Sequence, residues 1–290
     1  MTLRNLGFSL LFAVAPISLQ AQVTEDALRQ RINAAQQDPA PRNLIQAAEA
    51  ARLLGEFEQA LTLLEQSTAA VTQSMNSVIT NRLLLELASG GGIDGTLRAF
   101  RDARRQLNMT PQEIGSWINN FPELLSGGEF DDMIERFSPD AEDPLYRCNC
   151  YAYKAWMHRV AGRWSQSRAY WDSLNTAWEV NPVTTGDADF LADWHAQRAR
   201  NYARAGRQAD ARSALEQAMS MPVSDDGLAG VRRRWAQTYA ELGDVEGAIE
   251  QLEYLLSIPS LTTVHSLETR ITWEPIREHP AFQALLQRHR

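Results

Sequence analysis

The sequence lacks the patterns on which most enzymes and membrane-spanning proteins depend. Its 290 residues contain no Ser-His-Asp order, no H-E-x-x-H, no phosphate-binding loop and no kinase motif, and its five histidines are scattered. Beyond the N-terminus, no segment reaches the roughly 18 continuous apolar residues that a membrane helix needs. The sequence therefore predicts a protein that is not an enzyme, needs no cofactor and has no membrane span.

Lysine and strand-forming patterns are also scarce. Lys154 is the only lysine among the 28 basic residues, a bias that fits a GC-rich bacterial genome at least as well as a functional demand. The formal net charge of −8 argues against general nucleic-acid binding, which needs basic residues to neutralise phosphates. No run of alternating β-branched residues occurs, whereas apolar residues recur with helical spacing nearly throughout. We therefore expect an all-α fold.

Residues 1–21 resemble a secretory signal peptide. Arg4 supplies the positive start, residues 6–19 form the apolar core, and Ala21 is a small residue before a cleavage site at Gln22. The mature chain is then expected to be periplasmic or secreted. The alternative is that this segment forms a buried N-terminal helix.

A glycine recurs between two amphipathic segments, at intervals of 34 to 44 residues. Around the later turns, a small residue lies seven positions before the glycine, a tyrosine four before it, and a second small residue five after it. Small residues at these places let two antiparallel helices approach closely. Repetition at this period is typical of a helical solenoid. The turn glycines are Gly55, Gly92, Gly128, Gly162, Gly206 and Gly243, and the flanking sets include Ala199, Tyr202 and Ala211, then Ala236, Tyr239 and Ala248.

These features are similar to the tetratricopeptide repeat family, and the resemblance covers about residues 41–262 with about six repeats. It implies a right-handed superhelical solenoid of antiparallel helix pairs. Residues 22–40 are expected to form an N-terminal capping helix and residues 263–290 a C-terminal capping segment. An insert near residues 181–190 lengthens one interval, and we interpret it as a loop.

The expected caps have recognisable apolar faces. The segment from Thr24 to Gln37 places Leu28, Ile32 and Ala35 on one side of a helix. The tail ITWEPIREHPAFQALLQRHR resembles a segment that often follows the last repeat in bacterial proteins of this family. Pro280 is expected to open a final helix, which would cover the end of the core with Phe282, Leu285 and Leu286.

The segment 148–171 gathers two cysteines, a histidine and several aromatic residues. As a repeat centred on Gly162, it would place Ala155 at the close-packing position and Tyr151, Trp171 and Leu174 in the core. Three states remain open for Cys148 and Cys150: buried thiols, a local disulfide, or part of a soft-metal site. Side chains two apart on a helix point to different sides, which disfavours both the disulfide and the metal.

The family resemblance also implies a concave groove, lined by the first helix of each pair, that holds a peptide or a partner helix. Because Trp156 follows Ala155 by one position, we expect it to face this groove rather than the core. Guanidinium groups bind carboxylates in a bidentate manner, so an arginine-rich groove would suit an acidic partner. The expected partner-binding residues are Arg82, Asn149, Trp156, Arg159, Arg200, Arg204 and Arg233, with Arg52, Asp193 and Gln237 on the same face.

The sequence thus predicts a non-catalytic interaction module or scaffold of the bacterial cell envelope. Its partner would be an unidentified protein or peptide, and the arginines favour an acidic one. One alternative is a periplasmic sensor or carrier that binds a small ligand or soft metal near residues 148–171. Another is an accessory subunit of an envelope enzyme. The arginines could also simply solvate a helix face and pair with neighbouring carboxylates.

Overall fold

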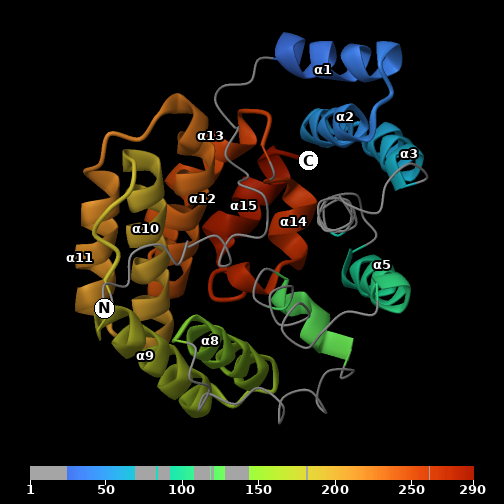
Figure 1. The fold of residues 1–290 in the computed structure, drawn as a ribbon. Helices are drawn as coiled ribbons and strands as arrows, with labels where there is room; N and C mark the ends of the chain where they lie inside the picture. The colour runs from blue at the N-terminus through green and yellow to red at the C-terminus, as the bar shows by residue number, and fades with distance from the viewer. Residues whose placement is uncertain are drawn as a thin grey trace, which may run out of the picture.

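The computed structural model describes residues 25–68, 83, 92–107, 118, 121–127, 144–180, 182–260 and 262–290. Within these ranges every regular element is a helix, which confirms the all-α prediction (Figure 1). No described helix is long and apolar enough to cross a membrane.

Most helices form hairpins, in which a short turn joins two packed helices. In the described part of the chain, four hairpins share this form, and each turn contains one of the glycines identified in the sequence. The pairs are α2 (Pro41–Leu53) with α3 (Phe57–Thr68), α8 (Pro144–Val160) with α9 (Trp164–Val180), α10 (Ala188–Ala205) with α11 (Gln208–Met219), and α12 (Asp225–Leu242) with α13 (Val245–Leu256).

The turn glycines end the first helix of each hairpin in the left-handed conformation. Gly55, Gly162, Gly206 and Gly243 have φ values between +70° and +82°. At Gly206 the amide donates to the carbonyl of Ala203, and the next amide, of Arg207, donates to that of Tyr202. This double hydrogen bond is the Schellman arrangement, which favours glycine because a Cβ is strained at positive φ. Of the other two predicted turns, Gly92 is the first residue of α5 (Gly92–Leu107), and Gly128 lies outside the described residues.

Small residues pack where the hairpin helices approach most closely. Ala199, Ala211, Ala236 and Ala248 are fully buried, as the spacing around Gly206 and Gly243 predicts. Apolar clusters follow one another along the chain: one joins α1 (Glu25–Gln37) to α3, a second α5 to α9, a third α10 and α11 to the start of α12, and a fourth α12 to the C-terminus. Each segment of the chain therefore packs mainly against its neighbours in sequence.

Helices occur in both terminal segments that the sequence predicts as caps. Helix α1 (Glu25–Gln37) packs on α2 and buries the predicted face of Leu28, Ile32 and Ala35. Pro280 is the first residue of α15 (Pro280–Arg288), and this helix buries Phe282, Leu285 and Leu286 against α12 and α13. These two apolar faces were predicted correctly.

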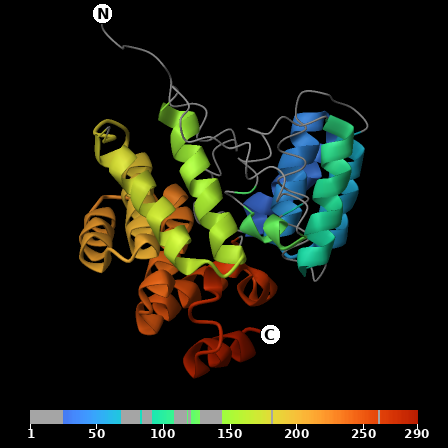
Figure 2. The ribbon, with the colours of Figure 1, turned by 90° about the horizontal axis from the view of Figure 1, so that it is seen from below.

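The C-terminal segment also returns toward the middle of the chain. Figure 1 shows α14 (Val264–Thr269) and α15 between α12 and α13 on one side and α5 on the other. The buried carboxylate of Glu123 in η1 (Pro122–Gly127) accepts hydrogen bonds from the Ile271 amide at 3.0 Å and from Arg270 Nε at 3.4 Å. A short helix, η2 (Ile271–Trp273), then packs on α12. Figure 2 shows the N-terminal helices and α5 on one side of the molecule, α8 and α9 on the other, and the C-terminal helices below. The C-terminal segment contacts α12, one of the helices that the sequence predicts to line an open groove.

Candidate functional site

Six of the seven predicted partner-binding residues are described, whereas Arg82 lies outside the described residues. They come from the first helices of three successive hairpins, α8, α10 and α12. Hydrogen bonds to Glu241 and Gln237 of α12 hold Arg159, Arg200 and Arg204 on one side of that helix. We call the following set the inner arginine cluster: Arg52 of α2, Arg159 of α8, Arg200 and Arg204 of α10, and Arg233 and Arg234 of α12.

The centre of this cluster is Glu241, near the end of α12. Arg159 Nη1 donates to both Glu241 carboxylate oxygens, at 2.7 and 2.9 Å, and Arg204 Nε donates to one of them at 2.9 Å. The side chains of all three are at least 94% buried. Charge-assisted hydrogen bonds in such a dry place are among the strongest in proteins. Glu241 therefore links α8, α10 and α12 at a single point.

We call Arg159, Arg204 and Glu241 the triad. Burial and the charges of its members change the pKa of Glu241 and of Arg204. Burial alone would raise the pKa of Glu241, but the nearby charges of Arg159 and Arg204 and their hydrogen bonds lower it below its ordinary value. Burial lowers the pKa of Arg204 to about 10, and Glu241 offsets part of that effect. Both groups are therefore charged at neutral pH, and the triad carries one net positive charge before other neighbours are considered.

Trp156 does not face open solvent, so the prediction that it lies outside the core is wrong. Its side chain is only 2% exposed and packs edge-on against Trp171, with ring centroids 5.6 Å apart. The guanidinium carbon of Arg204 lies 4.3 Å from its ring centroid, and that of Arg159 lies 5.3 Å away. Such stacking of guanidinium on indole is favourable when water is excluded. These two arginines cover the Trp156 ring.

Five other residues predicted on the groove face are buried as well, including Arg52 and Gln237. Asn149, Arg159 and Arg204 are each less than 9% exposed, so the expectation that they line an open groove is wrong. Glu241 covers the two arginines from α12, and Glu274 of the returning C-terminal segment approaches Arg159 Nε at 3.8 Å. A part for these residues in partner binding stays a prediction.

Arg200 and Arg233 are different, because they are half-buried and have no carboxylate within ion-pair distance among the described residues. Arg200 donates only to the side-chain oxygen of Gln237. Arg234, next to Arg233, pairs with Asp193 of α10. Burial lowers the pKa of Arg200 well below its ordinary value and that of Arg233 to about 9. Because a guanidinium stays protonated in proteins, both residues carry a charge with no carboxylate counter-ion among the described residues.

The inner arginine cluster holds more positive than negative charge. Among the described residues, four carboxylates lie within 4.0 Å of its six guanidiniums, so two positive charges are in excess. This excess occurs inside a protein whose overall formal charge is −8. The four carboxylates belong to Glu49, Asp193, Glu241 and Glu274. An inner surface of this kind attracts anionic groups.

Many side chains of residues 148–171 pack into one buried apolar cluster. Cys148 and Cys150 lie in the buried part of α8 and do not form a disulfide. No group of three or more metal-capable side chains occurs in the described part of the chain. Ala155, Trp171 and Leu174 are buried as predicted, but Tyr151 is only partly buried. The fully buried tyrosine is Tyr153.

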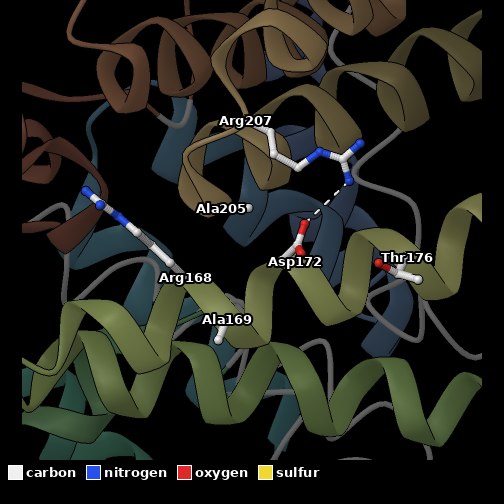
Figure 3. A pocket seen from close by; sticks show the side chains of 6 residues that line it. All are labelled: Arg168, Ala169, Asp172, Thr176, Ala205 and Arg207. Carbon is white, nitrogen blue, oxygen red and sulfur yellow. Dashed lines mark hydrogen bonds and ion pairs between the residues drawn. The ribbon is translucent and has the colours of Figure 1, made fainter.

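A shallow hollow lies between α9 and the start of α11. Figure 3 shows that its lining includes Arg168, Asp172 and Arg207, with the Arg207 guanidinium turned toward Asp172. Arg207 also pairs with Glu179 at 2.9 Å and with Asp210 at 2.7 Å. Its charge is thus already satisfied within the chain, which makes the hollow a poor candidate for anion binding.

Glu241 is the central residue that the sequence analysis missed, although the sequence contains a signal for it. Arg204 and Glu241 both lie two positions before a turn glycine, and Arg200 and Gln237 both lie six positions before one. Both bonded pairs are 37 residues apart, which is the interval between Gly206 and Gly243. Residues at equal repeat positions therefore meet, and their pairing follows from the repeat register.

No protein-family model matches this sequence, and a comparison with curated proteins finds no match.

Proposed function

We propose that the chain is a non-catalytic interaction module of the tetratricopeptide type, whose hairpins form a right-handed superhelix. Four hairpins with the same glycine turn support this proposal. The bonded pairs Arg200–Gln237 and Arg204–Glu241 support it further, because their separation equals one repeat. In a solenoid, equivalent positions of adjacent repeats stack in this way.

The partner that fits this module best has an acidic segment, which would approach the half-buried arginines of α10 and α12. The observation that carries this proposal is that Arg200 and Arg233, in an acidic protein, have no carboxylate within ion-pair distance among the residues that the structure describes. A carboxylate from a partner would supply the negative charge that these arginines lack and accept hydrogen bonds from their guanidinium N–H groups. The buried residues Trp156, Arg159 and Arg204 would then support the surface from below.

This proposal predicts a specific effect of Arg200. Partners captured by the purified chain from an envelope extract would be identified, purified and titrated against it. We expect Arg200→Gln to weaken the Kd about tenfold or more, because a charged hydrogen bond is lost. Added salt should weaken binding by the natural chain more than by this variant.

The matched control is Arg212→Gln, which removes an exposed arginine from the outer helix α11. It should leave the Kd unchanged. If the captured partner binds Arg200→Gln as tightly as the natural chain, at low and high salt alike, the acidic partner is wrong.

We also propose that the module acts outside the cytoplasm, after residues 1–21 are removed. This part rests on the sequence alone, because residues 1–24 lie outside the described part of the chain. N-terminal sequencing of the protein from the cell envelope should give a start near Gln22. Full-length chain in the cytoplasmic fraction, with none in the envelope, would contradict export.

A further inference from the structure

Two arginines and two tryptophans beside Glu241 hold buried N–H groups that donate no hydrogen bond to any described residue. The nitrogens are Arg159 Nε, Arg204 Nη2, Trp156 Nε1 and Trp171 Nε1. Nearly all buried polar groups in proteins are bonded, and a bound ion or water is a common explanation for an exception. Arginine and tryptophan side chains have donors and no acceptor, so only a group that accepts hydrogen bonds can satisfy them.

These four side chains are in contact with one another, and we call them the donor cluster. The guanidinium carbon of Arg204 lies 4.3 Å from the ring centroid of Trp156 and 4.9 Å from that of Trp171. The two indole centroids are 5.6 Å apart, and the guanidinium carbon of Arg159 lies 5.3 Å from that of Trp156. Each of the four residues is at least 93% buried. The unbonded donors therefore belong to a single buried place between α8, α9 and α10.

Glu241 satisfies only part of the donor cluster. Both of its carboxylate oxygens accept from Arg159 Nη1, and one also accepts from Arg204 Nε. In the described part of the chain, the other carboxylate near Arg159 is Glu274, whose closest oxygen lies 3.8 Å from Nε, beyond hydrogen-bond distance. The Glu274 side chain is 47% exposed, so solvent screens its charge. A further anion would have donors to bind that Glu241 does not use.

The buried charge beside the donor cluster is positive. Arg200 and Arg204 lie one helical turn apart on α10, where side chains are neighbours. Their acceptors Gln237 and Glu241 are likewise one turn apart on α12, so the two guanidiniums lie side by side. Arg200 Nε is also buried without a hydrogen-bond partner among the described residues. With Arg159, three positive charges face the one buried carboxylate of Glu241, which leaves an excess of two.

The donor cluster lies close to solvent although its members are buried. Arg159 is next to two exposed side chains, Glu274 and Trp164, and its guanidinium carbon lies 5.5 Å from the ring centroid of Trp164. Arg200 is itself only half-buried. An ion that approaches Arg159 from solvent therefore meets only surface side chains first.

We propose that the donor cluster, together with Arg200, binds a doubly charged, phosphate-type oxyanion. Such an ion carries a charge of about −1.5 to −2 near pH 7, which matches the excess of two, and has several acceptor oxygens for guanidinium and indole N–H groups. Guanidinium groups bind phosphate in a bidentate manner. A monocarboxylate supplies one charge and two oxygens, fewer than the donors require. The site goes beyond the proposed partner binding and does not depend on it, because its donors and charges all belong to this chain.

The test is a calorimetric titration of the purified mature chain, dialysed into chloride at pH 7, with inorganic phosphate at constant ionic strength. We expect saturable binding of one phosphate per chain, which differs from the general, unsaturable stabilisation that phosphate salts give to folded proteins. Acetate should not bind. A parallel titration with glycerol 3-phosphate distinguishes the source: binding of both compounds indicates a phosphate group on a larger ligand, and binding of phosphate alone indicates the free ion.

Two variants locate the site, and one controls for loss of charge. Arg204→Met removes a guanidinium but leaves Glu241 paired with Arg159, and it should weaken the phosphate Kd at least tenfold. Trp171→Phe keeps an aromatic ring in the core and removes one N–H donor, so the Kd should weaken about fivefold. Arg212→Met removes an exposed arginine of α11 and should leave the Kd unchanged.

Trp171→Phe decides the question if Arg204→Met does not fold, because it changes no charge. Absence of saturable phosphate binding by the natural chain would overturn the proposal, and ordered water would then be the acceptor. Acetate that binds as tightly as phosphate would overturn the assignment to a doubly charged ion. A phosphate Kd that is the same in the natural chain and in Trp171→Phe would place the ion elsewhere.

Discussion

Replacing Glu241 with glutamine should lower the free energy of unfolding by about 3 to 5 kcal/mol. The substitution keeps the shape of the side chain but removes its charge, so Arg159 and Arg204 are left in a dry interior without an anion. The loss of such a partner is costly because the remaining charges are not solvated. Urea unfolding, with the slope compared between variants, measures the effect.

The matched control is Glu253→Gln, which removes a carboxylate from an exposed ion pair with Arg288. Exposed pairs contribute about 0 to 1 kcal/mol, so this variant should be nearly as stable as the natural chain. Comparable losses in the two variants would show that Glu241 is not a buried anchor.

A combined variant distinguishes the destabilisation by an unpaired buried charge from the stability that the triad itself contributes. Replacing Arg159 and Arg204 with methionine and Glu241 with leucine removes all three charges together. Because apolar groups of similar volume often substitute for a buried triad without loss, most of the stability lost in Glu241→Gln should return. Failure to recover would mean that the geometry of the triad, and not charge balance, stabilises this part of the molecule.

The triad also predicts how stability depends on pH. The folded protein holds the pKa of Glu241 below its ordinary value. Its contribution is therefore fully present above the pKa of the unfolded chain and is lost as the pH falls through the folded pKa. The difference in stability between the natural chain and Glu241→Gln should be constant near neutrality and shrink in acid.

The sequence was most informative about local features that each repeat fixes by itself. Gly206 and Gly243 end helices because only a residue without Cβ adopts positive φ at little cost. Ala199 and Ala236 are buried because small side chains let paired helices approach. The apolar faces of α1 and α15 were also predictable, since helical spacing alone selects them.

The inner face could not be predicted in the same way, because contacts far apart in sequence decide its exposure. Helical geometry shows which side of α8 Trp156 occupies, but not what covers that side. Arg204 comes from the next hairpin, and Glu274 comes from a C-terminal segment that was expected only to cap the end. Glu241 is not among the residues that the sequence places on this face. Its separation from Arg204 equals the interval between Gly206 and Gly243, so the sequence does contain a signal for this pair.

The position of Trp156 can be tested most directly by truncation. Because the indole is 2% exposed and packs on Trp171 beneath Arg204, Trp156→Ala should remove buried apolar area and leave a cavity. Truncations of this kind cost about 3 to 5 kcal/mol, which urea unfolding would show as a lower midpoint. A groove-facing tryptophan would instead leave the midpoint almost unchanged and lower only the affinity for a partner.

Trp164 provides the control, because it is a tryptophan of the same hairpin that is 48% exposed. It lies at the start of α9, with the Arg159 guanidinium 5.5 Å from its ring centroid, and so shares a neighbour with Trp156. Trp164→Ala should change the unfolding free energy by less than about 1 kcal/mol, as expected for a surface position. If the two variants unfold at the same urea concentration, Trp156 is not a core residue. A large loss confined to Trp156→Ala would place the indole in the core and leave Arg200 and Arg233 as the inner residues accessible to a partner.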